Sequence, residues 1–167
     1  PVVVLSNNDG CIISRSNEAK KLGVEMAGPY FKAKPLIEKY DVAVFSSNYN
    51  LYGDLSWRVM ETLRILLGKN NVEVYSVDEA FLDLSIFPEN ELPAIAEKIK
   101  RVVEKWTGIK VSVGVAPTKV LAKVANRLSK KYVQQYNGVM ILNSKEKIIA
   151  ALKQTEVGEI WGIGHQY

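Results

Sequence analysis

The stretch YSVDEAFLDLS, residues 75–85, places two adjacent carboxylates, Asp78 and Glu79, in a segment that otherwise has the composition of a β-strand. Adjacent charges in such a setting are costly unless something pairs with them. Strand-like runs lie on both sides, at 72–77 and 80–85, so we expect a hairpin tip or a bulge at the pair. A turn can aim both carboxylates to one side, whereas a regular strand cannot.

A solvated turn is the ordinary alternative for this pair, because Asp is common in turns. The apolar and strand-forming neighbours Ala80, Phe81 and Leu82 favour instead carboxylates at the rim of a sheet, where divalent metals are often bound. Asp83 is a third candidate ligand. Strand alternation places it further along, so we favour a structural role for it.

The composition limits what such a metal can be. The chain has 167 residues, 47% of them hydrophobic and 24% charged, which is typical of a globular protein with a real core. A single His165 and a single Cys11 make a zinc site or a disulfide framework unexpected. Oxygen ligands point to magnesium, manganese or calcium. No apolar run approaches the roughly 20 residues that span a bilayer, so no membrane partner is expected.

Basic residues are concentrated in one part of the chain, whose net charge is +4. In the predicted helix 117–132, Lys119, Lys123 and Arg127 recur at every fourth position and form one stripe. An ordinary solvated basic face is the alternative. The single Glu104 among the basic residues of 98–131 favours phosphate binding instead. The basic residues of this region are Lys98, Lys100, Arg101, Lys105, Lys110, Lys119, Lys123, Arg127, Lys130 and Lys131.

Hydrophobic periodicity predicts an α+β fold, with a sheet that carries helices on one face. Pro35 is expected to break or delay the helix of 28–40. Asn143, with Glu146 three residues later, is expected to cap the last helix. The expected strands are 1–6, 11–14, 42–47, 72–77, 80–85, 110–116 and 138–142, and the expected helices are 14–24, 28–40, 48–68, 91–108, 117–132 and 143–154.

Taken together, these segments resemble the Y-family, or translesion, DNA polymerases. SVDEAFLDLS (76–85) is similar to their S-[IV]-D-E-A-[FY]-L-D motif, and VSVGVAPTKVLAKVANRLSKK (111–131) resembles their lysine-rich strand–turn–helix block. Four further segments look most similar to the bacterial UmuC branch (ImpB/MucB/SamB). They are PVVVLSNNDGCIISRSNEAKKLGV (1–24), GPYFKAKPL (28–36), FSSNYNLYGDLSWRVM (45–60) and IWGIG (160–164). The resemblance covers essentially the whole chain in order.

The resemblance implies a ferredoxin-like palm sheet with helices on one face, plus a small α/β fingers subdomain. Residues 1–13 would be palm, 14–70 fingers with a return helix, 71–155 palm, and 156–167 the start of a thumb. The implied setting is the bacterial cytoplasm, in association with the nucleoid.

The resemblance also implies a chemistry. Asp78 and Glu79 would be two of three catalytic carboxylates that seat two Mg²⁺ ions, with Mn²⁺ as an alternative. The reaction would transfer a nucleotide from a dNTP to a primer 3′-hydroxyl opposite damaged template, in DNA repair and the SOS response.

Other positions of the family's motifs fall on residues that would contact phosphates. The triphosphate would be bound by Ser14, Asn17, Lys20 and Lys130, and DNA by Lys119, Lys123, Arg127, Gly162 and Gly164. Asn17 and Lys20 depart from the Tyr and Arg that are usual in the family, and a Lys cannot bind phosphate as a bidentate fork.

In the family, a strand before the region matched here carries the first metal-binding Asp, and no residue of this chain matches it. We therefore expect a palm–fingers fragment that is inactive by itself and that self-associates through unpaired strand backbone. The implied partners are primer–template DNA, dNTP, a UmuD-like subunit, a recombinase filament and the sliding clamp.

Two other functions stay open. One is a non-catalytic module that binds damaged DNA. The other is a nucleotide-cyclase-like palm, which would call for a GG[DE]EF-like hairpin, and SVDEAF lacks its glycines.

Overall fold

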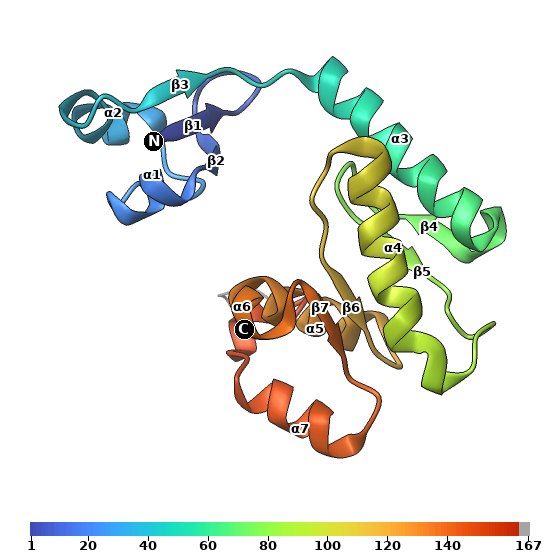
Figure 1. Cartoon of the computed structure of the whole chain (residues 1–167). Coiled ribbons are helices and arrows are strands. Elements are labelled where there is room, and N and C mark those ends of the chain that lie inside the picture. Colours follow the sequence, from blue (N-terminus) through green and yellow to red (C-terminus); the bar gives the residue numbers. More distant parts are fainter. Residues whose placement is uncertain (164–167) are drawn as a thin grey trace. The chain divides into compact units, whose positions relative to one another are not determined.

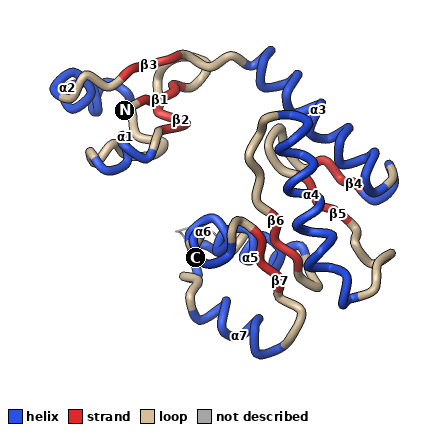
Figure 2. The backbone as a smooth tube through the Cα atoms, in the orientation of Figure 1, coloured by secondary structure: helices blue, strands red, loops and turns tan. Residues whose placement is uncertain are grey.

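The computed structural model describes residues 1–163 and divides the chain into two compact units, Pro1–Asp54 and Leu55–Tyr167. Helix α3 (Tyr49–Leu67) runs through the boundary between them (Figure 1). The predicted α+β class is confirmed, because the described residues form helices together with short sheets, two of which contain antiparallel strand pairs (Figure 2). The predicted palm, fingers and thumb boundaries stay predictions.

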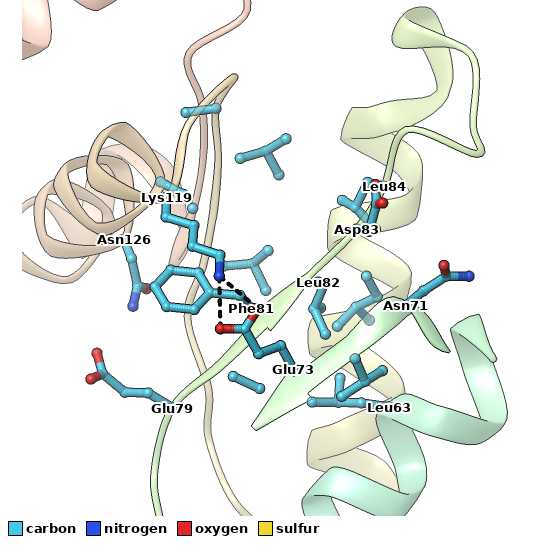
Figure 3. Close-up of a pocket in the computed structure, with 18 of the residues that line it drawn as sticks. Leu63, Asn71, Glu73, Glu79, Phe81, Leu82, Asp83, Leu84, Lys119 and Asn126 are labelled. Carbon is cyan, nitrogen blue, oxygen red and sulfur yellow. Dashed lines mark hydrogen bonds and ion pairs between the residues drawn. The ribbon is translucent and has the colours of Figure 1, made fainter. Parts of the chain in front are cut away.

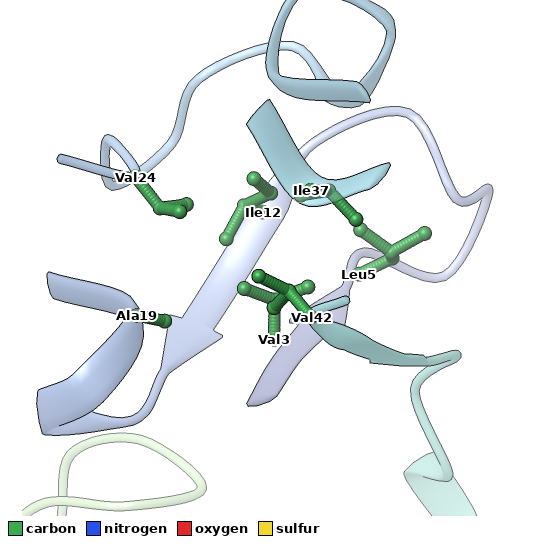
Figure 4. Close-up of a cluster of buried hydrophobic side chains, with 7 residues drawn as sticks. All are labelled: Val3, Leu5, Ile12, Ala19, Val24, Ile37 and Val42. Carbon is green, nitrogen blue, oxygen red and sulfur yellow. The ribbon is translucent and has the colours of Figure 1, made fainter. Parts of the chain in front are cut away.

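The first unit is built around β1 (Val2–Leu5), whose alternating apolar residues face a small core. It pairs antiparallel with β2 (Ile12–Arg15) and parallel with β3 (Ala43–Phe45). Helices α1 (Asn17–Lys21) and α2 (Tyr30–Lys39) complete the unit. The buried core, drawn in Figure 4, consists of Val3, Leu5, Ile12, Ala19, Val24, Ile37 and Val42.

The expected effect of Pro35 was wrong, because α2 runs unbroken from Tyr30 to Lys39 with Pro35 inside it. Proline removes one backbone donor and leaves the carbonyl four residues earlier, that of Phe31, without its helical partner. Both Pro35 and Phe31 are exposed, so water can reach that carbonyl. The burial of Ile37 in the core fixes the helix on its other face.

The second unit contains two separate two-stranded sheets. Strands β4 (Val72–Val74) and β5 (Ala80–Leu82) form an antiparallel hairpin, whereas β6 (Val113–Val115) and β7 (Val139–Ile141) pair in parallel. Within the described part of the chain the strands thus form three small sheets, where one continuous palm sheet was expected. The remaining elements are η1 (Lys69–Asn71), η2 (Glu89–Glu91), α4 (Leu92–Thr107), α5 (Lys119–Lys131), α6 (Val133–Tyr136), α7 (Lys145–Lys153) and η3 (Val157–Glu159).

Two apolar clusters hold this unit together. The first joins α3 and α4 to the β4–β5 hairpin and is centred on Met60, Leu63, Leu67, Ile99 and Val103. The second lies under α5 and α7 and is centred on Val124, Ala125, Leu128, Leu142 and Ala151. Each helix therefore buries one face, which leaves the opposite face of α5 to carry its basic side chains.

The last helix begins one residue later than expected. Ser144, not Asn143, is the N-cap of α7, and its hydroxyl accepts a hydrogen bond from the Lys147 amide at 3.3 Å. Asn143 instead accepts from the Lys147 ammonium at 2.7 Å. Serine and asparagine are nearly equivalent N-caps, so adjacent candidates cannot be ranked by residue type alone.

Candidate metal and phosphate site

The two carboxylates of the opening motif lie at the tip of the β4–β5 hairpin, as predicted. The strands pair up to Val74 and Ala80, and the amides of Tyr75 and Ser76 both donate to the Glu79 carbonyl at 3.0 Å. Val77 and Asp78 therefore lie in the closing turn, and Glu79 immediately precedes β5.

Asp78 is exposed and is held by a local turn. Its carboxylate accepts a hydrogen bond from the Ser76 hydroxyl at 2.7 Å, and its amide donates back to the same hydroxyl at 3.3 Å. This Ser–Asp turn orients one carboxylate oxygen and leaves the other open for a further ligand.

Glu79 is partly buried and is paired with a lysine from α5. The Lys123 ammonium lies 3.1 Å and 3.0 Å from the two carboxylate oxygens of Glu79. The Lys123 and Glu79 side chains are 25% and 34% exposed, respectively, so this pair is less open to water than an ordinary surface salt bridge.

The other two members of the α5 stripe are paired as well. Lys119 lies 2.7 Å and 2.6 Å from the carboxylate oxygens of Glu73 on β4, and Figure 3 shows it reaching over Phe81. Arg127 forms an ion pair with Glu159 in η3. Sequence reasoning missed these partners, because the acids come from other elements at least 32 residues away.

An aromatic cluster surrounds the two lysines, and sequence reasoning missed it too. Tyr75, Phe81 and Trp161 lie with ring centroids 5.4–5.6 Å apart, and the Trp161 indole donates to the Tyr75 hydroxyl at 3.1 Å. The Lys119 ammonium is 5.0 Å from the Phe81 ring centroid, and Lys123 is 5.1 Å and 5.4 Å from those of Tyr75 and Trp161. These distances allow cation–π attraction.

A cavity of about 920 Å³ opens beside the hairpin, between β5 and β6. Its inner wall is apolar and includes Leu63 and Leu82, while Glu73, Glu79 and Lys119 lie toward the polar part of its lining (Figure 3). Asp78 also lines this cavity. The hairpin tip is therefore open to a ligand on the cavity side.

The donor chemistry of Asp78 and Glu79 fits a hard divalent cation, because both supply carboxylate oxygens from one turn. Within residues 1–163, no three His, Cys, Asp or Glu side chains are grouped so that they could hold a metal ion. Two carboxylates leave most of an octahedral shell to other oxygens, such as those of water or a phosphate.

Asp83 follows β5 and accepts a hydrogen bond from the Ser85 amide at 2.9 Å. Hydrogen bonds from the side chain and the backbone of Ser85 lower the pKa of the Asp83 carboxyl below its usual value. It does not join Asp78 and Glu79 in a three-carboxylate group among the described residues, which suits the structural role favoured for it.

The remaining predicted phosphate contacts belong to both units. Ser14 on β2 and both Asn17 and Lys20 on α1 belong to the first unit, where the Lys20 ammonium donates to the Asn17 side chain at 3.4 Å. Lys130 is exposed in the last turn of α5. These four residues stay predictions as triphosphate contacts.

Of the two predicted glycines, Gly162 lies in a turn with a left-handed φ of 91°, which suits glycine. Among residues 1–163, no atom apart from those of its chain neighbours lies within 4 Å of the position that a Cβ atom would take there. Gly164 lies outside the described residues. As for membranes, no helix among residues 1–163 is both long and apolar enough to span a bilayer.

The family model and the similar proteins that match this chain all point to one family. Residues 1–127 match the impB/mucB/samB family. The chain is 45% identical to the protein UmuC of Salmonella typhimurium over 167 residues, which is 99% of this chain and 39% of that protein. It is also 34% identical to DNA polymerase IV of Protochlamydia amoebophila, covering 99% of this chain and 45% of that enzyme. The chain thus spans less than half the length of these relatives.

The fold agrees with the same group. An insertion ternary complex of Dbh DNA polymerase superposes with a TM-score of 0.81 at 29% identity, covering 99% of this chain and 47% of that one.

Proposed function

The chain belongs to the impB/mucB/samB family, and on this premise we propose that it is the palm and fingers part of an error-prone translesion DNA polymerase. The reaction proposed is nucleotidyl transfer from a dNTP to a primer 3′-hydroxyl opposite damaged template. The observation that supports the proposal is that the hairpin tip places Asp78 and Glu79 beside the basic stripe of α5.

The hairpin tip supplies the negative part of this site. Asp78 and Glu79 would hold divalent metal, Mg²⁺ or Mn²⁺, which when bound activates the primer hydroxyl and neutralises the triphosphate. The Ser76 hydroxyl orients Asp78, and the hairpin hydrogen bonds to the Glu79 carbonyl fix the backbone beneath both carboxylates. The apolar wall of the cavity limits water on the inner side.

The basic stripe supplies the positive part. Lys119, Lys123 and Arg127 would bind DNA phosphates, and Gly162 would offer its backbone amide to DNA phosphate as well. Ser14, Asn17, Lys20 and Lys130 would bind the triphosphate. Because each cation of the stripe is now neutralised by a carboxylate, DNA binding must exchange these ion pairs for phosphate contacts.

The wider assignments follow from the family and are proposals of the same kind. They place the protein in the SOS response of a bacterial cell, near the nucleoid, with a UmuD-like subunit, a recombinase filament and the sliding clamp as partners. We further propose that the 167-residue chain does not extend primers by itself, because within residues 1–163 no third His, Cys, Asp or Glu joins Asp78 and Glu79 in a group that could hold a metal ion.

Primer extension with the complete gene product tests the proposal. On undamaged and abasic templates with Mg²⁺, Asp78→Ala and Glu79→Ala are expected to lower the rate by about 100-fold or more, because each removes a metal ligand. Glu97→Gln, an exposed acid on α4, is the matched control and should leave the rate unchanged. If Asp78→Ala and Glu79→Ala extend primers as fast as the Glu97→Gln control, the proposal is refuted.

The same variants separate the alternatives. A non-catalytic DNA-binding module would show no extension in any form and would keep its DNA affinity in Asp78→Ala. A nucleotide cyclase would turn over nucleotide without primer–template. The family match and the Dbh superposition favour the polymerase over both.

A further inference from the structure

The proposed metal ligand Glu79 already has a cationic partner. The Lys123 ammonium is nearly equidistant from its two carboxylate oxygens, at 3.0 Å and 3.1 Å, and so uses both. Asp78, by contrast, takes its side-chain hydrogen bond from the neutral Ser76 hydroxyl. The two adjacent carboxylates therefore differ in what a metal would have to replace.

Lys123 is held in this position by more than the ion pair. Its ammonium lies 5.1 Å and 5.4 Å from the ring centroids of Tyr75 and Trp161, and its side chain is only 25% exposed. Helix α5 is in turn fixed against β6, because the backbones of Ala122 and Asn126 pack directly on Gly114. The ammonium is thus presented to Glu79 by a rigid helix.

We propose that Lys123 is a displaceable counter-cation. Its ammonium neutralises Glu79 in the absence of metal; a divalent cation that binds Glu79 displaces this ammonium, which then contacts a phosphate. This inference rests on the proposed metal site. It assigns Lys123 a role in ordering the events at that site, beyond that of a DNA contact.

The physical basis is competition for the same lone pairs. A bound Mg²⁺ lies about 2.0–2.1 Å from each carboxylate oxygen that coordinates it. The Lys123 ammonium occupies the space in front of both Glu79 oxygens, so the two cations compete for the same position. The two cations also repel each other at such short separation. The flexible lysine stem allows the ammonium to move without moving α5, and a phosphate is the group best suited to receive it.

Lys119 and Glu73 provide a matched pair. Lys119 occupies the preceding turn of the same helix face, makes a two-oxygen contact with Glu73, and lies over an aromatic ring, Phe81. Glu73, however, is on β4 and is not a proposed metal ligand. Loss of Lys119 removes the same charge and the same type of contact without freeing Glu79.

The experiment is Mn²⁺ titration of the complete gene product, followed by the electron paramagnetic resonance of free Mn²⁺. Lys123→Met is expected to bind Mn²⁺ about three- to tenfold more tightly than the unmodified protein, the effect of removing a partly exposed ion pair. Lys123→Arg, which keeps the cation, should stay near the unmodified value, and Lys119→Met should not tighten binding comparably.

Glu79→Gln separates failure of this inference from failure of the proposed function. If Glu79→Gln binds Mn²⁺ as tightly as the unmodified protein, the proposed metal site itself is wrong. If Glu79→Gln weakens binding but Lys123→Met leaves it unchanged or weaker, the metal site stands and the displacement is overturned.

A second readout on the unmodified protein avoids any folding defect of the variants. Lysine acetylation by a limiting reagent, mapped by mass spectrometry, is expected to rise at Lys123 when Mn²⁺ is added, and to stay level at Lys119. Unchanged or reduced acetylation of Lys123 with saturating Mn²⁺ would overturn the proposal, whatever the variants show.

Discussion

At the scale of single residues, Gly114 sets the distance between β6 and the helix that carries the basic stripe. A Cβ at this position would lie 2.3 Å from the Ala122 carbonyl oxygen and the Asn126 amide nitrogen. Both are backbone atoms of α5, which cannot rotate out of the way as a side chain can. The nearby Ser112 hydroxyl donates to the Asn126 side chain at 2.6 Å and fixes the same approach.

We therefore expect Gly114→Ala to lower the free energy of unfolding by about 3 kcal/mol, which is the upper end of the usual destabilisation by an overpacked side chain. Gly53→Ala in α3 is the matched control, because nothing lies within 4 Å of its added Cβ. It should instead stabilise by about 0.5–1 kcal/mol, the usual gain inside a helix. Urea denaturation measures both, and an unchanged Gly114→Ala midpoint would contradict the packing argument.

Among the described residues, three exposed carboxyls have lowered pKa values: Glu18, Asp83 and Glu146. For Glu146 the causes are hydrogen bonds from its own amide and then from Ser144, both at the start of α7. A lowered folded pKa contributes stability above the unfolded value of 4.5 for Glu, and this contribution is lost as the pH falls through the folded pKa.

We expect the melting temperature to fall as the pH is lowered from 6 to about 3, and Glu146→Gln to flatten that dependence slightly. The effect is small because the group is exposed. Glu97→Gln, an exposed acid on α4, serves as control. Thermal melts across this pH range provide the measurement, and a steeper pH dependence in Glu146→Gln would contradict the assignment.

At the scale of elements, the segment around η3 is attached to the hairpin by aromatic contacts and to α5 by an ion pair. Trp161 packs on Tyr75 and Phe81 and donates to the Tyr75 hydroxyl, while Glu159 pairs with Arg127. The hairpin tip, α5 and this segment thus share one set of contacts. The attachment should restrain the tip that carries Asp78 and Glu79.

Trp161→Ala is expected to loosen the hairpin tip by about 1–2 kcal/mol, from the lost ring contacts and hydrogen bond. The amides of Tyr75 and Ser76, which close the tip on the Glu79 carbonyl, should then exchange hydrogen about tenfold faster. Trp106→Ala on the exposed side of α4 should leave these two amides unchanged. Equal exchange in Trp161→Ala and the unmodified chain would show that the segment does not restrain the tip.

The sequence predicted the elements better than their contacts. The hairpin at Asp78 and Glu79 was predictable because turn residues interrupt two strand-like runs. The effect of Pro35 was predicted wrongly because the energetic cost of a proline inside a helix depends on whether water reaches the carbonyl that loses its partner. The hydrophobic periodicity of one helix does not reveal that exposure. The acids that neutralise the basic stripe could not be predicted, because tertiary packing alone brings Glu73, Glu79 and Glu159 to α5.

At the scale of the second unit, two strand edges face one cavity without pairing. All residues of β5 and β6 line the cavity of about 920 Å³, yet β5 pairs with β4 and β6 with β7, and not with each other. Its wall includes the apolar side chains of Leu63, Leu82 and Val113. Unpaired strand edges beside apolar surface are templates for another strand.

We therefore expect the 167-residue chain to self-associate, so that its average mass in sedimentation equilibrium rises with concentration. Hydrogen exchange should show the amides of β5 and β6 becoming more protected over the same range, because strand pairing covers them. Ile65→Lys removes an apolar residue of α3 that is 68% exposed and should leave the association unchanged. If that variant is monomeric, or if β5 and β6 gain no protection, association occurs through exposed helix surface, and the open strand edges are not its cause.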